Sequence, residues 1–215
     1  MKVLAFTGKG GSGKTTLTVS MAVSALAAGH SVGIIDTDPQ RSSRLWHQQR
    51  GTLDIRLTAC APEDFLVPFR RAERIGFDWL MVDTPPRIDG SLADVLRVAD
   101  FCLMPTRPAL FDLDATTRTA ELAQRLGRRF AMIINAASPR RAGRASPLVE
   151  DARRVLKRYG ARVWAGQITH RHALIHALTV GRGVIETEPD GPAAAEYRSL
   201  WTSIDRAIVA LDEAA

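Results

Sequence analysis

The segment that most constrains this chain is Gly8–Thr16, GKGGSGKTT, a glycine-rich stretch with two lysines. It fits the pattern G-x-x-x-x-G-K-[ST], in which glycines let consecutive backbone N–H groups curl around a polyphosphate. The apolar run Val3–Phe6 predicts a buried strand before it, and residues 15–28 predict a helix whose positive N-terminus faces the anion. The segment therefore predicts a nucleoside triphosphate site.

In this pattern Lys14 reaches the β- and γ-phosphates, and the hydroxyl of Thr15 ligates Mg²⁺. The chain has only four lysines against twenty-five arginines, yet both Lys9 and Lys14 are kept in the loop. A compact, flexible ammonium suits phosphate there better than a planar guanidinium. The predicted nucleotide-binding residues of the loop are Gly10, Gly11, Ser12, Gly13, Lys14, Thr15 and Thr16.

Length and composition bound the fold class. A chain of 215 residues, 46% hydrophobic and 24% charged, is typical of one globular α/β domain, here expected over residues 1–215. No apolar run is long enough for a membrane span, and the first residues lack the pattern of a signal peptide. Cys60 and Cys102 are too few for a disulfide scaffold or a cysteine metal site. These features predict a compact cytoplasmic protein.

Apolar runs of strand length alternate with segments of helix length. This alternation predicts a doubly wound α/β fold, with a mostly parallel sheet flanked by helices. After Val3–Phe6, the expected strands are 31–35, 54–58, 79–82, 101–104 (closed by Pro105), 130–134 and a last one near 162–168. The expected helices are 15–28, 41–50, 62–74, 112–126, 148–159 and a final helix with Tyr197, Leu200, Trp201, Ile204, Ile208 and Leu211 on one stripe.

Three acids end predicted strands. In doubly wound sheets the ligand lies beyond the carboxyl ends of the strands, where Asp36, Asp38 and Asp83 would gather. One carboxylate could hold a water bound to Mg²⁺ while another orients the water that attacks the γ-phosphate. Asp83 fits the acid that reaches Mg²⁺ through its hydration shell. Any single strand-end aspartate is as often a helix cap as a ligand.

Positive charge is concentrated in one part of the chain. The formal charge is +6, and residues 125–182 hold thirteen Arg or Lys against only Glu150 and Asp151. The rest of the chain is therefore net acidic. Such segregation indicates a face that binds a polyanion such as DNA, although arginines that are merely solvated are the simpler alternative.

Three motifs together resemble a known family. KGGSGKTT, then DTDPQ at residues 36–40, then an apolar run ending in DTPP at residues 83–86, resemble the ParA-type partition ATPases of the deviant Walker A (ParA/MinD) group. The short ParF-like form, without an N-terminal helix-turn-helix, is the most similar. The resemblance covers nearly the whole chain, including residues 104–108, Phe111–Asp112 and 166–171.

The resemblance implies roles for individual residues. It implies that Lys9 acts in trans on ATP bound by a second subunit and that Lys14 acts in cis. Thr16 would lie near the α-phosphate, and Asp38 would position the hydrolytic water. Asn135 would contact the adenine, although an Asn that merely turns the chain is an open alternative. The implied ligands of Mg²⁺ are Thr15, Asp36 and Asp83.

The resemblance also implies partners. These are a homodimer in the ATP state, non-specific double-stranded DNA, and a ParB-like or other adaptor that stimulates hydrolysis, with no membrane. The protein would then be cytoplasmic and associated with the nucleoid. The residues expected to contact DNA are Arg171 first, then Arg140, Arg141, Arg144, Arg153, Arg154 and Arg158.

The expected function is therefore Mg²⁺-dependent ATP hydrolysis that segregates plasmid or chromosomal cargo. A related ATPase that positions a protein compartment such as a carboxysome fits the same residues, because cargo choice lies with the adaptor. A MinD-like regulator is less consistent, since its basic amphipathic end is absent from residues 208–213. A P-loop biosynthetic ligase would have no reason to bind DNA.

Overall fold

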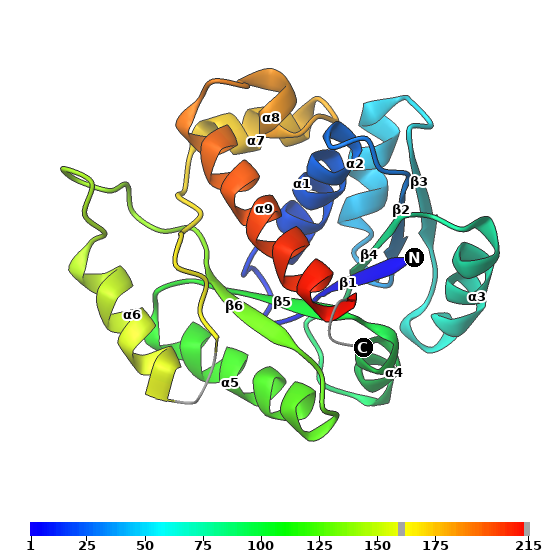
Figure 1. Ribbon diagram of the computed structural model, residues 1–215, viewed down its shortest axis with the longest axis horizontal. Helices are drawn as coiled ribbons and strands as arrows, with labels where there is room; N and C mark the ends of the chain where they lie inside the picture. Colours follow the sequence, from blue (N-terminus) through cyan, green and yellow to red (C-terminus); the bar gives the residue numbers. More distant parts are fainter. Residues whose placement is uncertain (159–161, 213–215) are drawn as a thin grey trace.

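The computed structural model describes residues 1–158 and 162–212 of the chain. Its centre is a six-stranded sheet in which every neighbouring pair of strands is parallel, in the order β3-β2-β4-β1-β5-β6 (Figure 1). The strands are β1 (Lys2–Phe6), β2 (Val32–Asp36), β3 (Ile55–Ala59), β4 (Trp79–Asp83), β5 (Phe101–Thr106) and β6 (Phe130–Ile134).

Helices cover both faces of the sheet and bury one apolar cluster on each face. One face carries α3 (Leu66–Ile75), α4 (Gly90–Val98), α5 (Leu110–Arg125) and α6 (Pro147–Arg158). The other face carries α1 (Lys14–Ala27), α2 (Ser42–Arg50), α7 (His172–Thr179), α8 (Val184–Thr187) and α9 (Pro192–Asp212). A short 3₁₀ turn, η1 (Pro62–Asp64), precedes α3. The predicted doubly wound fold is confirmed.

Strand side chains alternate between the two clusters, as the period of a strand requires. In β1, Val3 and Ala5 pack on the face of α3–α6, whereas Leu4 and Phe6 pack on the face of α1 and α9. Because both faces are covered, β1, β2 and β4 read as continuous apolar runs. The stripe predicted for the last helix is confirmed for Tyr197 through Ile208, which are buried in α9; the Leu211 side chain lies outside the described part.

Two strand predictions need correction. The strand expected to close at Pro105 continues to Thr106, paired with β6. Proline lacks the N–H that a strand on both sides would need, but the pairing of β5 with β1 ends at Leu103, so Pro105 is tolerated. The strand expected near 162–168 does not form. That segment meets β6 through one isolated bridge, between Met132 and Val163, and the chain bends at Ala165 and Gly166.

Helices also depart from the predictions. The helix expected over 62–74 is divided into η1 and α3. Helix α4 had no sequence prediction; Asp89 caps it by accepting hydrogen bonds from the N–H groups of Ser91 and Leu92. The helix predicted to end at Tyr159 is described up to Arg158, and Tyr159 lies outside the described residues. Within the described residues, every helix is too short or too polar to span a lipid bilayer.

Candidate nucleotide-binding site

The candidate site lies at the carboxyl ends of β1, β2 and β4. Parallel register places Asp83 beside both Phe6 of β1 and Asp36 of β2. The glycine-rich loop begins directly after β1, so the loop and the two acids meet at one edge of the sheet. The sequence prediction that the strand-end acids gather beside the loop is confirmed in its geometry.

The loop has the backbone that a phosphate cradle needs. Gly8, Gly11 and Gly13 all have positive φ angles, which glycine adopts without strain. Gly13 is the N-cap of α1 and supplies no side-chain cap, so the first N–H groups of the helix remain available to an anion. A Cβ atom at Gly13 would lie 2.2 Å from the Asn135 amide nitrogen, so only glycine fits there.

Lys14 is buried inside the loop, with 6% of the residue exposed. Its ammonium donates to the carbonyl oxygens of Gly8 at 3.0 Å and Lys9 at 3.2 Å. Burial lowers the pKa of Lys14, and the nearby carboxylates of Asp83 and Asp38 oppose that shift only in part. Lys14 is therefore a buried cation without a directly bonded anion, as expected of a group that awaits phosphate.

Lys9 lies in a different environment. Its side chain is 40% exposed and forms an ion pair with Asp112 of α5. The backbone of Lys9 faces inward, because its carbonyl accepts hydrogen bonds from the N–H and hydroxyl of Ser12. The two lysines of the loop thus lie in different environments: Lys14 is buried against the loop carbonyls, and Lys9 is partly exposed and paired with the first turn of α5.

Asp83 is fully buried, and burial raises its pKa to about 6 against the lowering effect of the neighbouring hydroxyls of Thr15 and Ser43. Oδ2 accepts a hydrogen bond from Ser43 at 2.8 Å, whereas Oδ1 is enclosed with no hydrogen-bond donor. An enclosed carboxylate oxygen without a donor, beside a threonine hydroxyl, fits an oxygen-coordinated divalent cation. The residues present therefore fit Mg²⁺.

Asp36 and Asp38 differ in burial and in the number of hydrogen bonds that their carboxylates accept. Asp36 is buried, which raises its pKa, and its oxygens accept from the N–H groups of Asp38 and Arg44. Those bonds shape the start of α2, so Asp36 has the capping contacts that the sequence left as an alternative. Asp38 is half-buried, and its Oδ1 accepts from the N–H of Gln40. Its negative charge is near enough to Lys14 to raise the pKa of that lysine, in part against the effect of burial.

Among the residues that the structure describes, no group of three or more His, Cys, Asp or Glu side chains is arranged to bind a metal ion by itself. A cation at Asp83 and Thr15 would consequently depend on phosphate oxygens and water for its remaining ligands. This is the usual manner in which Mg²⁺ is held with a nucleotide.

A pocket of about 190 Å³ extends from the loop past the end of β6. Its walls include Gly13, Asn135, Arg107 and Arg171. The Asn135 amide donates to the Ser12 carbonyl at 2.6 Å, so it fixes the loop in this conformation. The pocket adjoins the loop at Gly11–Gly13 and Thr16, and the adenine contact of Asn135 stays a prediction.

Sequence reasoning missed part of this site. Ser43, which holds Asp83, belongs to no motif, and its position seven residues after Asp36 gave no signal. The segment from Thr169 to Arg171 forms a pocket wall because Glu196 of α9 binds both the N–H and the hydroxyl of Thr169. These contacts link residues far apart in the sequence and could not be inferred from spacing.

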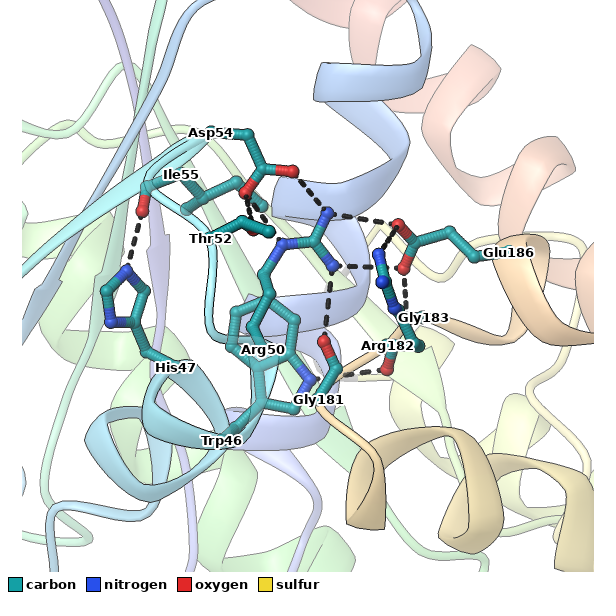
Figure 2. A network of polar contacts seen from close by, with 10 residues as sticks. All are labelled: Trp46, His47, Arg50, Thr52, Asp54, Ile55, Gly181, Arg182, Gly183 and Glu186. Carbon is teal, nitrogen blue, oxygen red and sulfur yellow. Dashed lines mark hydrogen bonds and ion pairs between the residues drawn. The ribbon is translucent and has the colours of Figure 1, made fainter.

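Helix α2 connects the acids to the C-terminal region. At its start lie Ser43 and Arg44, which contact Asp83 and Asp36. At its end the Arg50 side chain, only 1% exposed, forms ion pairs with Asp54 and Glu186 (Figure 2). The guanidinium also donates to the Gly181 carbonyl. The Trp46 indole donates to the Arg182 carbonyl, which adds to the attachment of α2 (Figure 2).

The arginines predicted to contact DNA fall into distinct environments. Arg171 pairs with Glu196 and lines the nucleotide pocket. Arg153 is half-buried and donates to the carbonyls of Trp164 and Gly166. Arg154 is exposed but pairs with Asp151. Those exposed on the loop before α6 are Arg140, Arg141 and Arg144; the side chain of Arg158 lies outside the described part.

The structure thus does not bring the predicted DNA contacts onto one free surface. Arg171, the first choice from the sequence, lies with the nucleotide loop, because its guanidinium is held by Glu196 and α9 fixes that carboxylate. A role for Arg171 and the others at DNA stays a prediction. Among the predicted DNA contacts, the exposed loop residues Arg140, Arg141 and Arg144 are the most accessible to a DNA backbone.

The chain matches a known nucleotide-binding family. A model of the CobQ/CobB/MinD/ParA nucleotide-binding domain family matches residues 3–184. The chain belongs to this family. The resemblance to ParA-type ATPases is therefore confirmed at the level of the family, and the short ParF-like form stays a prediction. A search of curated proteins finds no match.

Solved structures agree with the family fold. Apo McdA from Cyanothece is similar with a TM-score of 0.77 and 17% identity, covering 94% of this chain and 98% of that one. The MinC:MinD complex of Aquifex aeolicus gives 0.75 and 20%, with 95% of each chain covered. A putative plasmid partition protein of Borrelia burgdorferi bound to AMPPNP gives 0.71 and 16%, covering 91% and 95%. At such identities these likenesses establish the CobQ/CobB/MinD/ParA fold alone.

Proposed function

We propose that this chain is a Mg²⁺-dependent ATPase that dimerises around ATP and then binds DNA non-specifically. An adaptor that stimulates hydrolysis would release it from DNA and so position a cargo. Membership of a nucleotide-binding family supports the first step. A related MinD of Pyrococcus horikoshii was solved with Mg-ADP, and the Borrelia relative was solved with AMPPNP.

The proposed chemistry follows from the residues at the sheet edge. Lys14 would exchange its two carbonyl contacts for phosphate oxygens, while N–H groups of α1 hold the same phosphates. Thr15 and Asp83 would hold Mg²⁺, which neutralises the charge that develops during phosphoryl transfer. Asp38, which uses one oxygen to accept from Gln40, would orient the attacking water with the other.

The observation that carries the dimer is the divergence of the two lysines. A phosphate-binding loop needs one lysine for its own nucleotide, and Lys14 holds that position. Lys14 is buried in the cradle, whereas Lys9 is 40% exposed and pairs with Asp112 in the first turn of α5. Lys9 is thus free to reach a phosphate on a facing subunit once its ion pair with Asp112 opens.

The test is sedimentation of the protein with ADP and with an uncleavable ATP analogue. Wild type should be monomeric with ADP and dimeric with the analogue. Lys9→Ala should bind the analogue and stay monomeric. Lys157→Ala, which removes an exposed lysine of α6, is the matched control and should dimerise normally. A Lys9→Ala dimer of unchanged stability would contradict the assignment in trans.

DNA binding is proposed from the positive charge of the chain. Dimerisation doubles the basic surface, and phosphate contacts release counterions, so affinity should fall steeply with salt. Duplex binding measured with ADP and with the uncleavable analogue should differ by at least about tenfold. The cargo, whether plasmid, chromosome or protein compartment, is specified by the adaptor. A pull-down with the ATP-bound dimer would identify that adaptor.

A further inference from the structure

A second basic pocket lies at the edge of the sheet opposite the nucleotide site. It has a volume of about 330 Å³ and is formed where β5 and β6 begin. We call it the edge pocket. Its lining residues are Phe101, Gln124, Arg128, Arg129, Phe130 and Arg162.

The guanidinium groups of the edge pocket have no hydrogen-bonded or ion-paired partner among the described residues. Within residues 1–158 and 162–212, no side-chain hydrogen bond or ion pair involves Arg128, Arg129 or Arg162. The Nε of Arg128 is enclosed, yet it has no acceptor. An enclosed donor without an acceptor calls for a ligand or water. By contrast, Arg50 and Arg171 both have carboxylate partners.

A structural explanation for these arginines is that they cap α5, since cations stabilise the C-terminal end of a helix. The backbone already does this. The N–H groups of Leu126, Gly127 and Arg128 donate to the carbonyls of Leu122, Gln124 and Ala123. Gly127 has the positive φ angle that this termination requires. The guanidinium groups are therefore not needed to satisfy the end of the helix.

Building on the proposed function, we propose that the edge pocket binds a phosphate of the DNA backbone. Its donors come from three parts of the chain: the turn that ends α5, the residue just before β6, and Arg162. Guanidinium groups donate pairs of parallel hydrogen bonds that match phosphate oxygens. Arg129 and Arg162 are exposed, so a polymer can pass across the pocket without being enclosed.

The position of the edge pocket favours DNA over a nucleotide or a second subunit. In the proposed dimer, the edge of the sheet that carries Lys9 and Lys14 is covered by the facing subunit. The edge pocket lies at the other ends of β5 and β6, so it stays open on both subunits. Two such pockets on one dimer would give the ATP state its higher affinity for a duplex.

The test is duplex binding by the dimer formed with the uncleavable ATP analogue, over a series of salt concentrations. The double variant Arg129→Ala/Arg162→Ala should bind at least about tenfold more weakly. The slope of log affinity against log salt should fall by about 0.9 for each phosphate that the variant no longer neutralises. Arg129→Lys/Arg162→Lys keeps the charge and should retain most of the slope. Analogue binding and dimerisation should be unchanged, which shows that both variants are folded.

The charge-matched control is Arg70→Ala/Arg74→Ala on the exposed side of α3, which should leave duplex affinity and the salt slope close to those of wild type. If wild type binds duplex in the ATP state and the edge-pocket variant binds equally well, the pocket assignment is overturned while the proposed function stands. If wild type does not bind duplex in either nucleotide state, both are overturned. If inorganic phosphate protects Arg129 and Arg162 from chemical modification but duplex DNA does not, the pocket is a small-anion site and the DNA assignment is wrong.

Discussion

Two buried cations, Lys14 in the nucleotide loop and Arg50 at the end of α2, have opposite surroundings. Among the described residues, the ammonium of Lys14 donates to two carbonyl oxygens of its own loop, and burial lowers its pKa. Burial alone would lower the pKa of Arg50 too, but hydrogen bonds to Asp54 and Glu186 raise it. The Arg50 guanidinium also lies over the Trp46 ring (Figure 2).

The difference separates a binding group from a structural one. A cation that is completely paired, as Arg50 is, has nothing left to offer a ligand. Lys14 has been taken out of water without receiving a direct anionic partner, which costs stability until phosphate arrives. Asp83, with one oxygen lacking a donor, is the acidic counterpart of Lys14. Incomplete pairing of buried charge therefore marks the nucleotide site in this molecule.

Breaking the complete pairing should have the largest effect on stability. Arg50→Ala leaves Asp54 and Glu186 without their shared cation and detaches α2 from residues 181–186. Removing one partner from a buried ion pair typically costs about 3–5 kcal/mol. We expect the free energy of unfolding in urea to fall by an amount toward the lower end of that range, because the Asp54 and Glu186 side chains are 36% and 26% exposed. Arg182→Ala, which removes an exposed partner of Glu186, should change it by less than about 1 kcal/mol.

A result in which both arginine variants are equally stable would show that the Arg50 ion pairs do not stabilise the fold. Nucleotide affinity provides the second measurement. The folded fraction of Arg50→Ala should still bind nucleotide, because Arg50 does not reach the loop.

Removing Lys14 should have the opposite effects: nucleotide binding should be lost, and the stability of the nucleotide-free protein should be kept. Truncating one partner of a buried charge pair costs about 2–5 kcal/mol in binding, so Lys14→Ala should weaken ATP binding by at least about thirtyfold. The free energy of unfolding without nucleotide should be unchanged or higher, because a desolvated ammonium is removed. Isothermal titration with ATP and urea unfolding would show both effects. ATP affinity equal to wild type would refute the assignment of the loop.

The raised pKa of Asp83 should make the free energy of unfolding depend on pH. Burial raises its pKa from 3.8 to about 6, so between these values the folded state binds the proton more tightly than the unfolded chain. The contribution of Asp83 to the free energy of unfolding should therefore fall by about 3 kcal/mol as pH rises from about 4 to about 6. Asp83→Asn removes this dependence and should stabilise the nucleotide-free protein at neutral pH while impairing hydrolysis.

The matched control for Asp83 is Asp54→Asn. The hydrogen bond from Arg50 lowers the pKa of Asp54, so its stabilisation is present at neutral pH and lost as pH falls through that lowered value. Asp54→Asn should thus destabilise the protein at neutral pH. If the two variants change stability in the same direction, the distinction between incomplete and complete pairing fails.

The sequence predicted the nucleotide edge well, because its geometry is local. Glycines at fixed spacing set the loop, and acids that end apolar strands of a parallel sheet must meet at one edge. It predicted poorly whatever depends on long-range partners. Arg50 looked like any helical arginine, Ser43 belonged to no motif, and the ion pair between Arg171 and Glu196 gave no signal in the sequence, while the DNA contact of Arg171 stays a prediction.

Two errors in the fold have the same origin. The apolar run at 162–168 reads as a strand, but the chain bends at Gly166, and Arg153 binds the carbonyls of Trp164 and Gly166 at the bend. Helix α4 depends on the cap at Asp89 and on burial of its apolar face, which a short segment after two prolines did not indicate. Tertiary contacts decided both.

The smallest expected effect concerns Lys9, the lysine outside the cradle. Its ion pair with Asp112 is partly exposed, so Asp112→Asn should change the free energy of unfolding by less than about 1 kcal/mol. Under the proposed function, this pair competes with the phosphate of a facing subunit. Because each dimer opens two such pairs, and about 1 kcal/mol corresponds to about fivefold, Asp112→Asn should lower the concentration at which the ATP-bound dimer forms by no more than about twenty-five-fold. Sedimentation with the uncleavable analogue measures this shift, and Asp114→Asn, on the exposed side of α5, is the control. A weaker dimer in Asp112→Asn would show that the pair supports dimerisation in the bound state instead of restraining Lys9 in the free one.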